Sequence, residues 1–118
     1  MIVRFLKPSH FSGTAKLTVH KTGKLGFSKG AMELLQTKKN RFVRFGFDEK
    51  EQLLLEVSSY EVENSFPVYK AGDYDYINAK SMLDDLGVDY AGRDTTIFDL
   101  KKLQEKDLYR LIERTIKK

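Results

Sequence analysis

The sequence predicts an α+β fold: a small, mostly antiparallel β domain with two short helices and a C-terminal segment that forms a helix or a strand. Apolar and polar residues alternate over many short runs, which is the period of a half-buried strand. Glycine-containing turns separate these runs, and two short stretches carry apolar residues at helical spacing instead. A chain of 118 residues without cysteine predicts a single domain, residues 1–118, whose core forms without disulfides.

The first elements are expected to be strands joined by a tight turn. Residues 2–6 predict a strand, and residues 9–14 a loop. Residues 15–20 alternate between apolar and polar side chains and predict a second strand. Gly23 can supply the positive φ that a hairpin turn requires before the returning strand at residues 25–27.

A short helix is expected to follow this hairpin. Ser28 can accept a hydrogen bond from the free N–H groups of the first helical turn. Ala31, Leu34 and Leu35 lie at i, i+3 and i+4, so they share one face. The helix is expected to end near Gln36.

Residues 41–57 predict a β-hairpin, the clearest local pattern in the chain. The first strand, residues 41–47, places Val43, Phe45 and Phe47 on one face. The second, residues 53–57, is an almost continuous apolar run and is therefore expected to be central in its sheet. Residues 58–67 are polar and acidic, and they are the candidate boundary between two halves, 1–58 and 66–118.

The second half repeats the alternation of strand and helix. Strands are expected at residues 66–70, 74–77 and 95–100. Between the last two, Asn78 is expected to cap a helix that Gly87 ends, and its apolar face is formed by Met82, Leu83 and Leu86.

The C-terminal segment fits two structures. Leu108, Leu111, Ile112 and Ile116 have helical spacing, which favours a helix. The alternative is a strand at residues 107–115 that pairs back onto residues 95–100.

Charge is distributed very unevenly along the chain. Residues 1–45 hold ten Lys or Arg and one acid, a net charge of +9, whereas residues 46–100 hold four against thirteen, a net charge of −9. The last eighteen residues hold seven against three. This asymmetry between a basic half and an acidic half favours a polyanionic partner for the first half. The alternative is that these are solvated faces and that the two blocks attract each other within the fold.

The basic residues of the first half are the candidate nucleic-acid-binding residues. Lysine contacts phosphates, and arginine can also read guanine, for which Arg41 or Arg44 would serve. Phe11, Phe42, Tyr60 or Tyr69 could stack on unpaired bases. The full candidate set is Lys16, His20, Lys21, Lys24, Lys29, Lys38, Lys39, Arg41 and Arg44.

Little in the sequence indicates catalysis, a metal or a cofactor, and none of these is expected. His10 and His20 are the only histidines, and neither has a partner at catalytic or metal-ligand spacing. The triplet at residues 99–101 has the acid-x-Lys pattern of some metal-dependent nucleases, but a non-enzymatic protein is favoured. The acids Asp73, Asp75, Asp84, Asp85 and Asp89 are expected to form a solvated face.

Two segments of the chain share a plan of strand, turn, strand, cap, short helix and strand. Lys21, Thr22 and Gly23 match Lys70, Ala71 and Gly72, and Leu25 and Phe27 match Tyr74 and Tyr76. If the two segments are repeats, neither half buries its apolar face alone and the two interlock as a pseudo-dimer.

Residues 15–57 resemble the swapped-hairpin domain of the AbrB/MazE/MraZ family of DNA-binding regulators. The shared features are the Gly23 turn with its basic flanks, the capped short helix and the following hairpin. Lys24 and Ser28 depart from the Arg and Pro that are usual in the family. The resemblance implies a cytoplasmic regulator that binds DNA rather than RNA and forms homo-oligomers. The pattern is also compatible with Whirly-like single-strand binders.

A protein–protein interaction module is the alternative function. The acidic half contains several tyrosines, a residue type that is enriched at protein interfaces. Such a module would be antitoxin-like, or an accessory protein of a phage or mobile element, and would not bind nucleic acid. No apolar run reaches the ~20 residues of a membrane span, so no membrane partner is expected.

Overall fold

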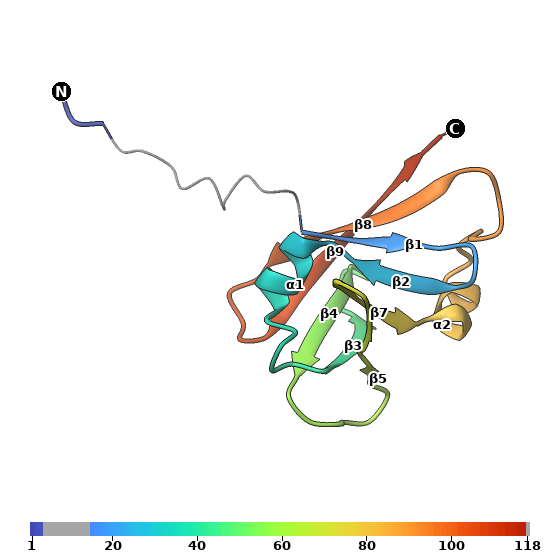
Figure 1. Cartoon of the computed structure of the whole chain (residues 1–118), viewed down its shortest axis with the longest axis horizontal. Coiled ribbons are helices and arrows are strands. Elements are labelled where there is room, and N and C mark those ends of the chain that lie inside the picture. Colours follow the sequence, from blue (N-terminus) through green and yellow to red (C-terminus); the bar gives the residue numbers. More distant parts are fainter. Residues whose placement is uncertain (4–14, 118) are drawn as a thin grey trace.

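The computed structural model describes residues 1–3 and 15–117. These residues form nine strands and two helices (Figure 1). The expected strand at residues 2–6 lies outside the described residues except for Ile2 and Val3, which are exposed and in no strand, and His10 and Phe11 also lie outside them. In chain order the elements are β1 (Lys16–Val19), β2 (Lys24–Phe27), α1 (Lys29–Leu35), β3 (Phe42–Phe47), β4 (Leu53–Ser58), β5 (Phe66–Pro67), β6 (Tyr69–Ala71), β7 (Tyr74–Asn78), α2 (Lys80–Asp85), β8 (Thr95–Lys102) and β9 (Leu108–Ile116).

The nine strands form one antiparallel sheet that curls into a nearly closed barrel. Their order is β5-β3-β4-β9-β8-β1-β2-β7-β6, and every pair of neighbours is antiparallel. The strands at the two ends of this order, β5 and β6, are consecutive in the chain and only Val68 lies between them. The backbone N–H of Val68 donates to the carbonyl of Arg41, 2.8 Å away, just before β3. The two ends of the sheet therefore meet at this residue, which we call the seam.

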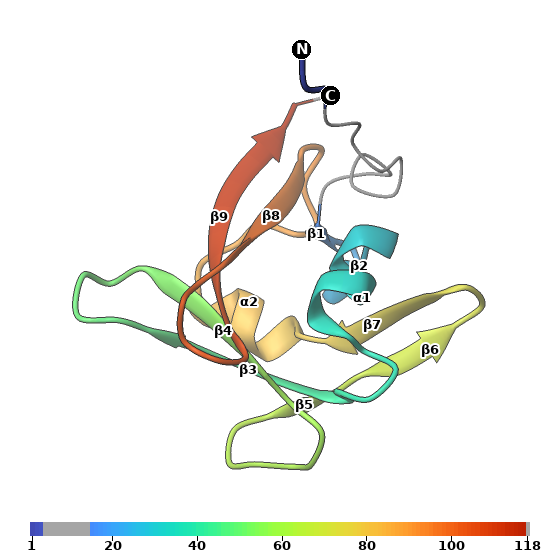
Figure 2. The same cartoon turned by 90° about the vertical axis from the view of Figure 1, so that its left-hand side faces the viewer.

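The core fills the inside of the barrel, and the two helices lie at opposite ends of it. Figure 1 shows α1 toward the left and α2 toward the right of the sheet, and Figure 2 looks from the α1 side. Helix α1 buries Ala31 and Leu35, and α2 buries Leu83. The other fully buried apolar side chains come from alternate positions of the strands, and the largest are Leu17, Leu25, Leu55, Ile77 and Phe98. The prediction of a small, mostly antiparallel β domain with two short helices is confirmed.

A buried polar cluster fastens the seam from inside. The carboxylate of Asp75 on β7 is 2% exposed. It accepts a hydrogen bond of 2.6 Å from Thr37 Oγ1 and lies 3.2 Å from Arg41 Nη1. Arg41 also donates to the carbonyls of Thr37 and Val68, at 3.0 and 2.8 Å. Buried polar groups are stable only when they are paired, so this cluster holds β7, the α1–β3 connection and the seam in one arrangement.

Several local predictions are confirmed. Ser28 caps α1, because its Oγ accepts from the backbone N–H of Ala31 at 3.1 Å. Gly23 has the positive φ that its turn requires, 88°, and Gly87 follows α2 with φ 73°. Strands β3 and β4 form the expected hairpin, and β4 is central between β3 and β9.

The C-terminal helix that the spacing favoured is wrong, and the alternative strand is correct. Strand β9 pairs with β8 over eight residue pairs, from Thr95↔Ile116 to Lys102↔Tyr109. Tyr109 and Leu111 point to the core at alternate positions, whereas Ile112 and Ile116 are each 42% exposed. In a helix, all of these apolar residues would lie on one buried face. As a strand, the segment buries only Tyr109 and Leu111, but its backbone N–H and C=O groups pair with β8 along nearly its whole length, and this pairing favours the strand.

Two predictions in the second half are also wrong. Asn78 does not cap α2: it is the last residue of β7, opposite Lys24, and Ala79 takes the N-cap position without a side-chain hydrogen bond. Residues 66–70 do not form one strand. They divide at Val68 into β5 and β6, because the chain passes there from one end of the sheet to the other.

The residue match between the two segments does not hold in detail. Leu25 is buried, whereas its proposed equivalent Tyr74 is 46% exposed, and the buried positions of β7 are Asp75 and Ile77. Phe47, which shares a face of β3 with the buried Val43, lies at the outer end of this strand and is 59% exposed.

Over the described ranges, neither helix has the length and apolar character that a membrane-crossing helix needs.

Candidate nucleic-acid interface

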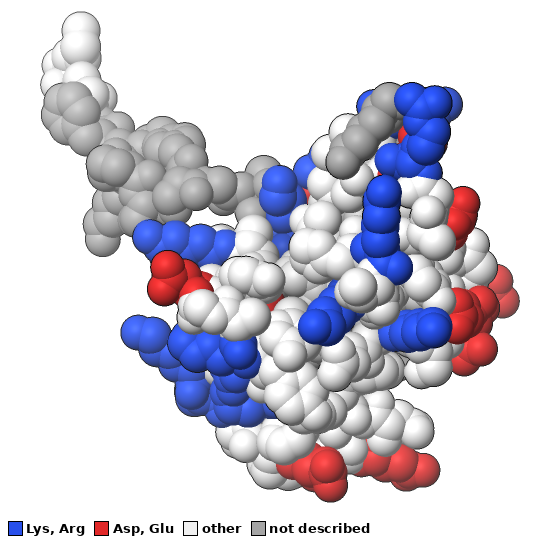
Figure 3. Space-filling model, turned by 45° about the vertical axis from the view of Figure 1, so that its right-hand side comes forward, with Lys and Arg blue, Asp and Glu red and all other residues white. Residues whose placement is uncertain are grey.

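The nine candidate residues do not form one continuous basic face. Figure 3 shows Lys and Arg side chains in separate groups divided by uncharged surface. Acidic side chains gather toward the right-hand and lower margins, and a further one lies among the basic side chains on the left. The structure divides the candidates into a group around α1, a group at the β1–β2 turn, and two arginines with partners inside the protein.

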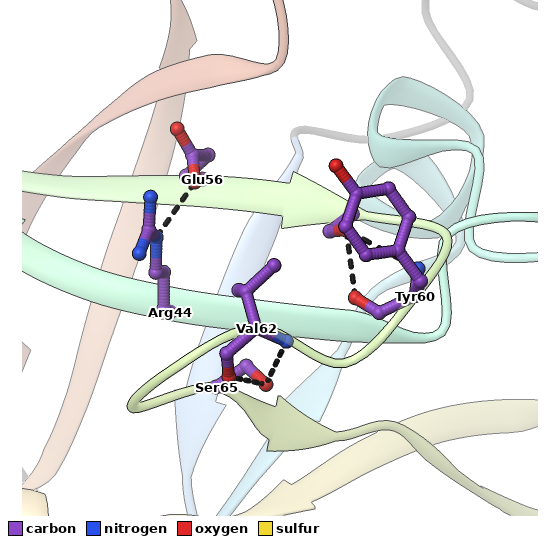
Figure 4. A network of polar contacts seen from close by, with 6 residues as sticks. Arg44, Glu56, Tyr60, Val62 and Ser65 are labelled. Carbon is purple, nitrogen blue, oxygen red and sulfur yellow. Dashed lines mark hydrogen bonds and ion pairs between the residues drawn. The ribbon is translucent and has the colours of Figure 1, made fainter.

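The two arginines are engaged in intramolecular contacts. Arg41 is held at the seam by Asp75 and by two backbone carbonyls. Arg44 Nε donates to Glu56 Oε1 at 2.7 Å across the β3–β4 hairpin (Figure 4). An arginine that reads guanine presents two N–H donors to one base. Both terminal nitrogens of Arg41 are engaged, so its contacts would have to break first, whereas Arg44 is held through Nε alone.

The first lysine group surrounds α1. Lys16 begins β1, and its backbone carbonyl accepts from the N–H of Ser28, which brings it beside Lys29 at the start of the helix. Lys38 and Lys39 follow the helix in the connection to β3 and are exposed. Lys39 also lines a hollow of about 470 Å³ together with Arg44, Tyr60 and Val62. Figure 4 shows these last three side chains, of which Tyr60 and Val62 belong to the β4–β5 loop. Tyr60 is 68% exposed there.

The second group lies at the β1–β2 turn. His20 precedes this turn and Lys24 follows it. The N–H of His20 donates to the carbonyl of Lys24 at 2.9 Å. Lys21 is exposed at its tip. Lys80 of α2 joins them, because a Cβ atom placed on Gly23 would lie 2.7 Å from Lys80 Cβ.

Next to this turn, the outer side of the sheet carries a row of aromatic rings. Tyr69 on β6 lies directly opposite Tyr76 on β7, with ring centroids 5.7 Å apart and an interplanar angle of 35°. Lys24 Nζ lies 4.7 Å from the centroid of the Tyr76 ring. Tyr69 and Tyr74 are 44% and 46% exposed. We call this surface the tyrosine–lysine face, formed by His20, Lys21, Lys24, Tyr69, Tyr74, Tyr76 and Lys80.

Gly26 extends the row toward β1. It lies opposite both Thr18 and Tyr76, and its missing side chain would point outward, since Leu25 and Phe27 point into the core. A Cβ at this position would lie 2.5 Å from His20 Nε2. The Nε2 end of the imidazole therefore lies against Gly26 on the outer side of the sheet, on the strand next to Tyr76.

Sequence reasoning included the lysines and Tyr69 but missed Tyr76 and Lys80 as members of this surface. Both belong to the half that was set aside as acidic. The β8–β9 hairpin adds a further basic surface, where Lys101 lies opposite Arg110 and Arg114 Nε donates to Asp99 Oδ2 at 2.6 Å. The excess of basic residues over the last eighteen positions was the signal for it.

The described residues do not bring together a group of three or more His, Cys, Asp or Glu that could hold a metal ion. Asp75 points inward, away from the other acids of its stretch.

The pKa values of two tyrosines differ from the ordinary value. A hydrogen bond to Asp84 raises the pKa of Tyr90, and burial, followed by the charge of Asp107, raises the pKa of Tyr109. Both phenols stay protonated in the ordinary pH range.

Comparisons of the chain with protein-family models, with curated proteins and with solved structures found no match.

Proposed function

We propose that this protein is a non-enzymatic nucleic-acid-binding module, and that it binds DNA in preference to RNA. The observation that carries the proposal is Lys24 seated over the partly exposed ring of Tyr76, because a cation and an aromatic ring then share one patch of sheet. Lysines bind phosphates without reading sequence, and exposed rings accept bases, so interleaving the two is characteristic of nucleic-acid surfaces. We include Lys16, Lys29, Lys38 and Lys39 as outer phosphate contacts.

The charge of the surface supports this assignment. Lys21 and Lys24 come from the part of the chain with ten basic residues and one acid. Lys80 adds a further cation where α2 meets the β1–β2 turn. Arg41 and Arg44 are left out of the interface, since their charges are matched by Asp75 and Glu56.

The test is fluorescence anisotropy with labelled DNA at several salt concentrations. Log affinity should fall linearly with log salt, and the double variant Lys21→Ala, Lys24→Ala should bind more weakly, with a slope smaller by about 2. The matched control is Lys50→Ala with Lys106→Ala, which removes the same charge from exposed turns elsewhere. Equal losses in the two variants would contradict the assignment of the surface, and no binding at low salt would contradict the function.

We also propose that the two segments are repeats that interlock as a pseudo-dimer, as the resemblance to swapped-hairpin regulators implies. The strand order supports this in part, because exchanging β1, β2, β3 and β4 for β6, β7, β8 and β9 preserves every pairing among these eight strands except β1 with β8. The counterpart of that pair would be β6 with β3, and β5 takes the place beside β3 instead. Strands β2 and β7 pair with each other, and so do β4 and β9, as counterparts related by a two-fold axis would. We expect a homo-oligomer in a reducing compartment such as the cytoplasm, which light scattering and fractionation would test.

The alternative is a protein–protein interaction module. The exposed tyrosines favour it, above all Tyr60 in the acidic β4–β5 loop, since exposed tyrosines commonly anchor interfaces. Purification with one stoichiometric protein partner and without nucleic acid would support this function against the first.

A further inference from the structure

We propose that the tyrosine–lysine face binds an unpaired nucleic-acid strand and that bases stack on the rings of Tyr69 and Tyr76. This inference rests on the proposed function and specifies its ligand. It follows from the geometry of the rings, from Gly26 and from the position of the cations.

The rings are arranged to receive flat ligands. Tyr69 and Tyr76 stand side by side on neighbouring strands, tilted by only 35°, rather than edge to face as Phe45 and Phe66 are inside the barrel, at 72°. Tyr69 is 44% exposed even though it belongs to a sheet. Aromatic rings lying on an open sheet surface accept bases of any sequence, because every base has a π face.

Because Gly26 has no side chain, nothing projects from this position of β2 between the tyrosine rings and β1. Its φ is not in the left-handed region, so the backbone conformation does not require glycine here. The requirement comes from His20, whose Nε2 would be 2.5 Å from an added Cβ. The glycine therefore lets the Nε2 end of the imidazole approach the sheet beside the strand that carries Tyr76.

The face fits a single strand better than a duplex. In a duplex the bases are stacked on one another, so a protein reaches only their edges and the phosphates. Duplex readers insert a helix or a β-ribbon into a groove. Here the two helices lie at the ends of the barrel (Figure 1), and the rings lie on the outer side of the sheet, opposite the buried Asp75 and Ile77 of β7. An unpaired strand can place its bases on the rings and its phosphates beside Lys21 and Lys24.

The position of Lys24 links the two contacts. Its ammonium already lies over the Tyr76 ring at 4.7 Å, a cation–π contact in the free protein. A base stacking on this ring would displace it by a short movement toward the adjacent phosphate. Lys24 therefore contacts the Tyr76 ring in the free protein and a phosphate of the ligand in the complex.

The experiment compares Tyr69→Ala, Tyr69→Phe and Tyr60→Ala on labelled oligothymidine and on a duplex hairpin of equal phosphate number. Wild type should prefer the single strand, and Tyr69→Ala should weaken that binding about 5-fold or more, because stacking contributes ~1–3 kcal/mol per base. Tyr69→Phe keeps the ring and should bind like wild type. Tyr60→Ala removes an exposed tyrosine elsewhere and should have no effect. Because the chain has six tyrosines and no tryptophan, quenching of tyrosine fluorescence by the oligonucleotide reports stacking directly.

Each outcome decides one point. Equal, salt-dependent binding to both DNAs with Tyr69→Ala unaffected would overturn the inference and leave the proposed function standing. No binding to either DNA at low salt would overturn both. Gly26→Ala gives a second test that leaves every charge in place. It should lower single-strand affinity by displacing the His20 ring, and unchanged affinity in a folded variant would contradict the role of the imidazole in binding.

Discussion

The seam offers a prediction whose size follows from the contacts. Asp75→Ala removes a buried carboxylate that accepts from Thr37 Oγ1 at 2.6 Å and lies 3.2 Å from Arg41 Nη1. A hydrogen bond to a charged group contributes about 1.5–3 kcal/mol. The Arg41 side chain is 34% exposed, so solvent screening limits the ion pair to about 1 kcal/mol or less. The variant should therefore lose about 3 kcal/mol of the free energy of unfolding.

Urea unfolding followed by far-UV circular dichroism measures this loss. Asp73→Ala is the matched control, since Asp73 is an exposed acid two residues away and should change stability by no more than about 0.5 kcal/mol. Asp75→Asn should fall between the two, because its amide oxygen can still accept from Thr37 while the charge is gone. A double-mutant cycle with Thr37→Val should give a coupling energy of about 1–3 kcal/mol.

The reasoning would be refuted if Asp75→Ala and Asp73→Ala destabilised the protein equally, or if the cycle gave no coupling. The first result would mean that the barrel is held closed by its core alone.

A second measurement follows from the position of Asp75 between Tyr74 and Tyr76 in the sequence. Loosening β7 should also weaken oligothymidine binding, although Asp75 lies on the opposite side of the strand and cannot contact the ligand.

Three further predictions concern stability. Gly23→Ala should cost more than Gly72→Ala in thermal unfolding, because both glycines have positive φ but only Gly23 would place its Cβ against another residue, Lys80 at 2.7 Å; equal losses would show that backbone strain alone matters. Ser28→Ala should cost about 1–2 kcal/mol in urea unfolding, because its hydroxyl caps α1 and also accepts from the start of β1; a loss below about 0.5 kcal/mol would contradict the double role. Tyr109→Phe should cost about 1 kcal/mol at neutral pH, since the phenol donates to a backbone carbonyl at 3.1 Å. Folding raises the pKa of Tyr109 above the ordinary value of 10.0, so this advantage of the wild type is complete below pH 10.0 and should shrink as pH rises through the folded-state pKa; an advantage that grew at alkaline pH would contradict the assignment.

Local signals in the sequence located most of the elements correctly. The Ser28 cap, the Gly23 turn and the β3–β4 hairpin depend on residues close together in the chain, so spacing and turn chemistry were sufficient. The C-terminal strand was different. Its apolar residues satisfy both helical and strand spacing, and the choice depends on pairing with β8 and β4, which local periodicity does not contain.

The candidate site shows the same division. The sequence shows that basic residues are concentrated in the first half, but it does not show which of them form ion pairs within the protein. Arg41 is matched by Asp75 and Arg44 by Glu56, and only tertiary structure reveals this. Tyr76 was treated as part of an acidic half, yet it lies beside Gly26 because β7 pairs with β2. A division of the chain into a basic and an acidic half could not anticipate a surface built from both.

The pairing of strands from both halves also determines when this chain can fold during its synthesis. Strand β1 needs β8, β2 needs β7, and β4 needs β9, so these three pairings between the halves wait for residues made later, as the shorter pairing of β3 with β5 also does. A nascent chain that stops after β4 exposes unpaired strand edges and an open apolar face, which is the state most prone to aggregation. Productive folding must therefore follow the emergence of β9 from the ribosome. A chain that lacked β9, through a shortened message or through proteolysis, would lose the partner strand of both β4 and β8.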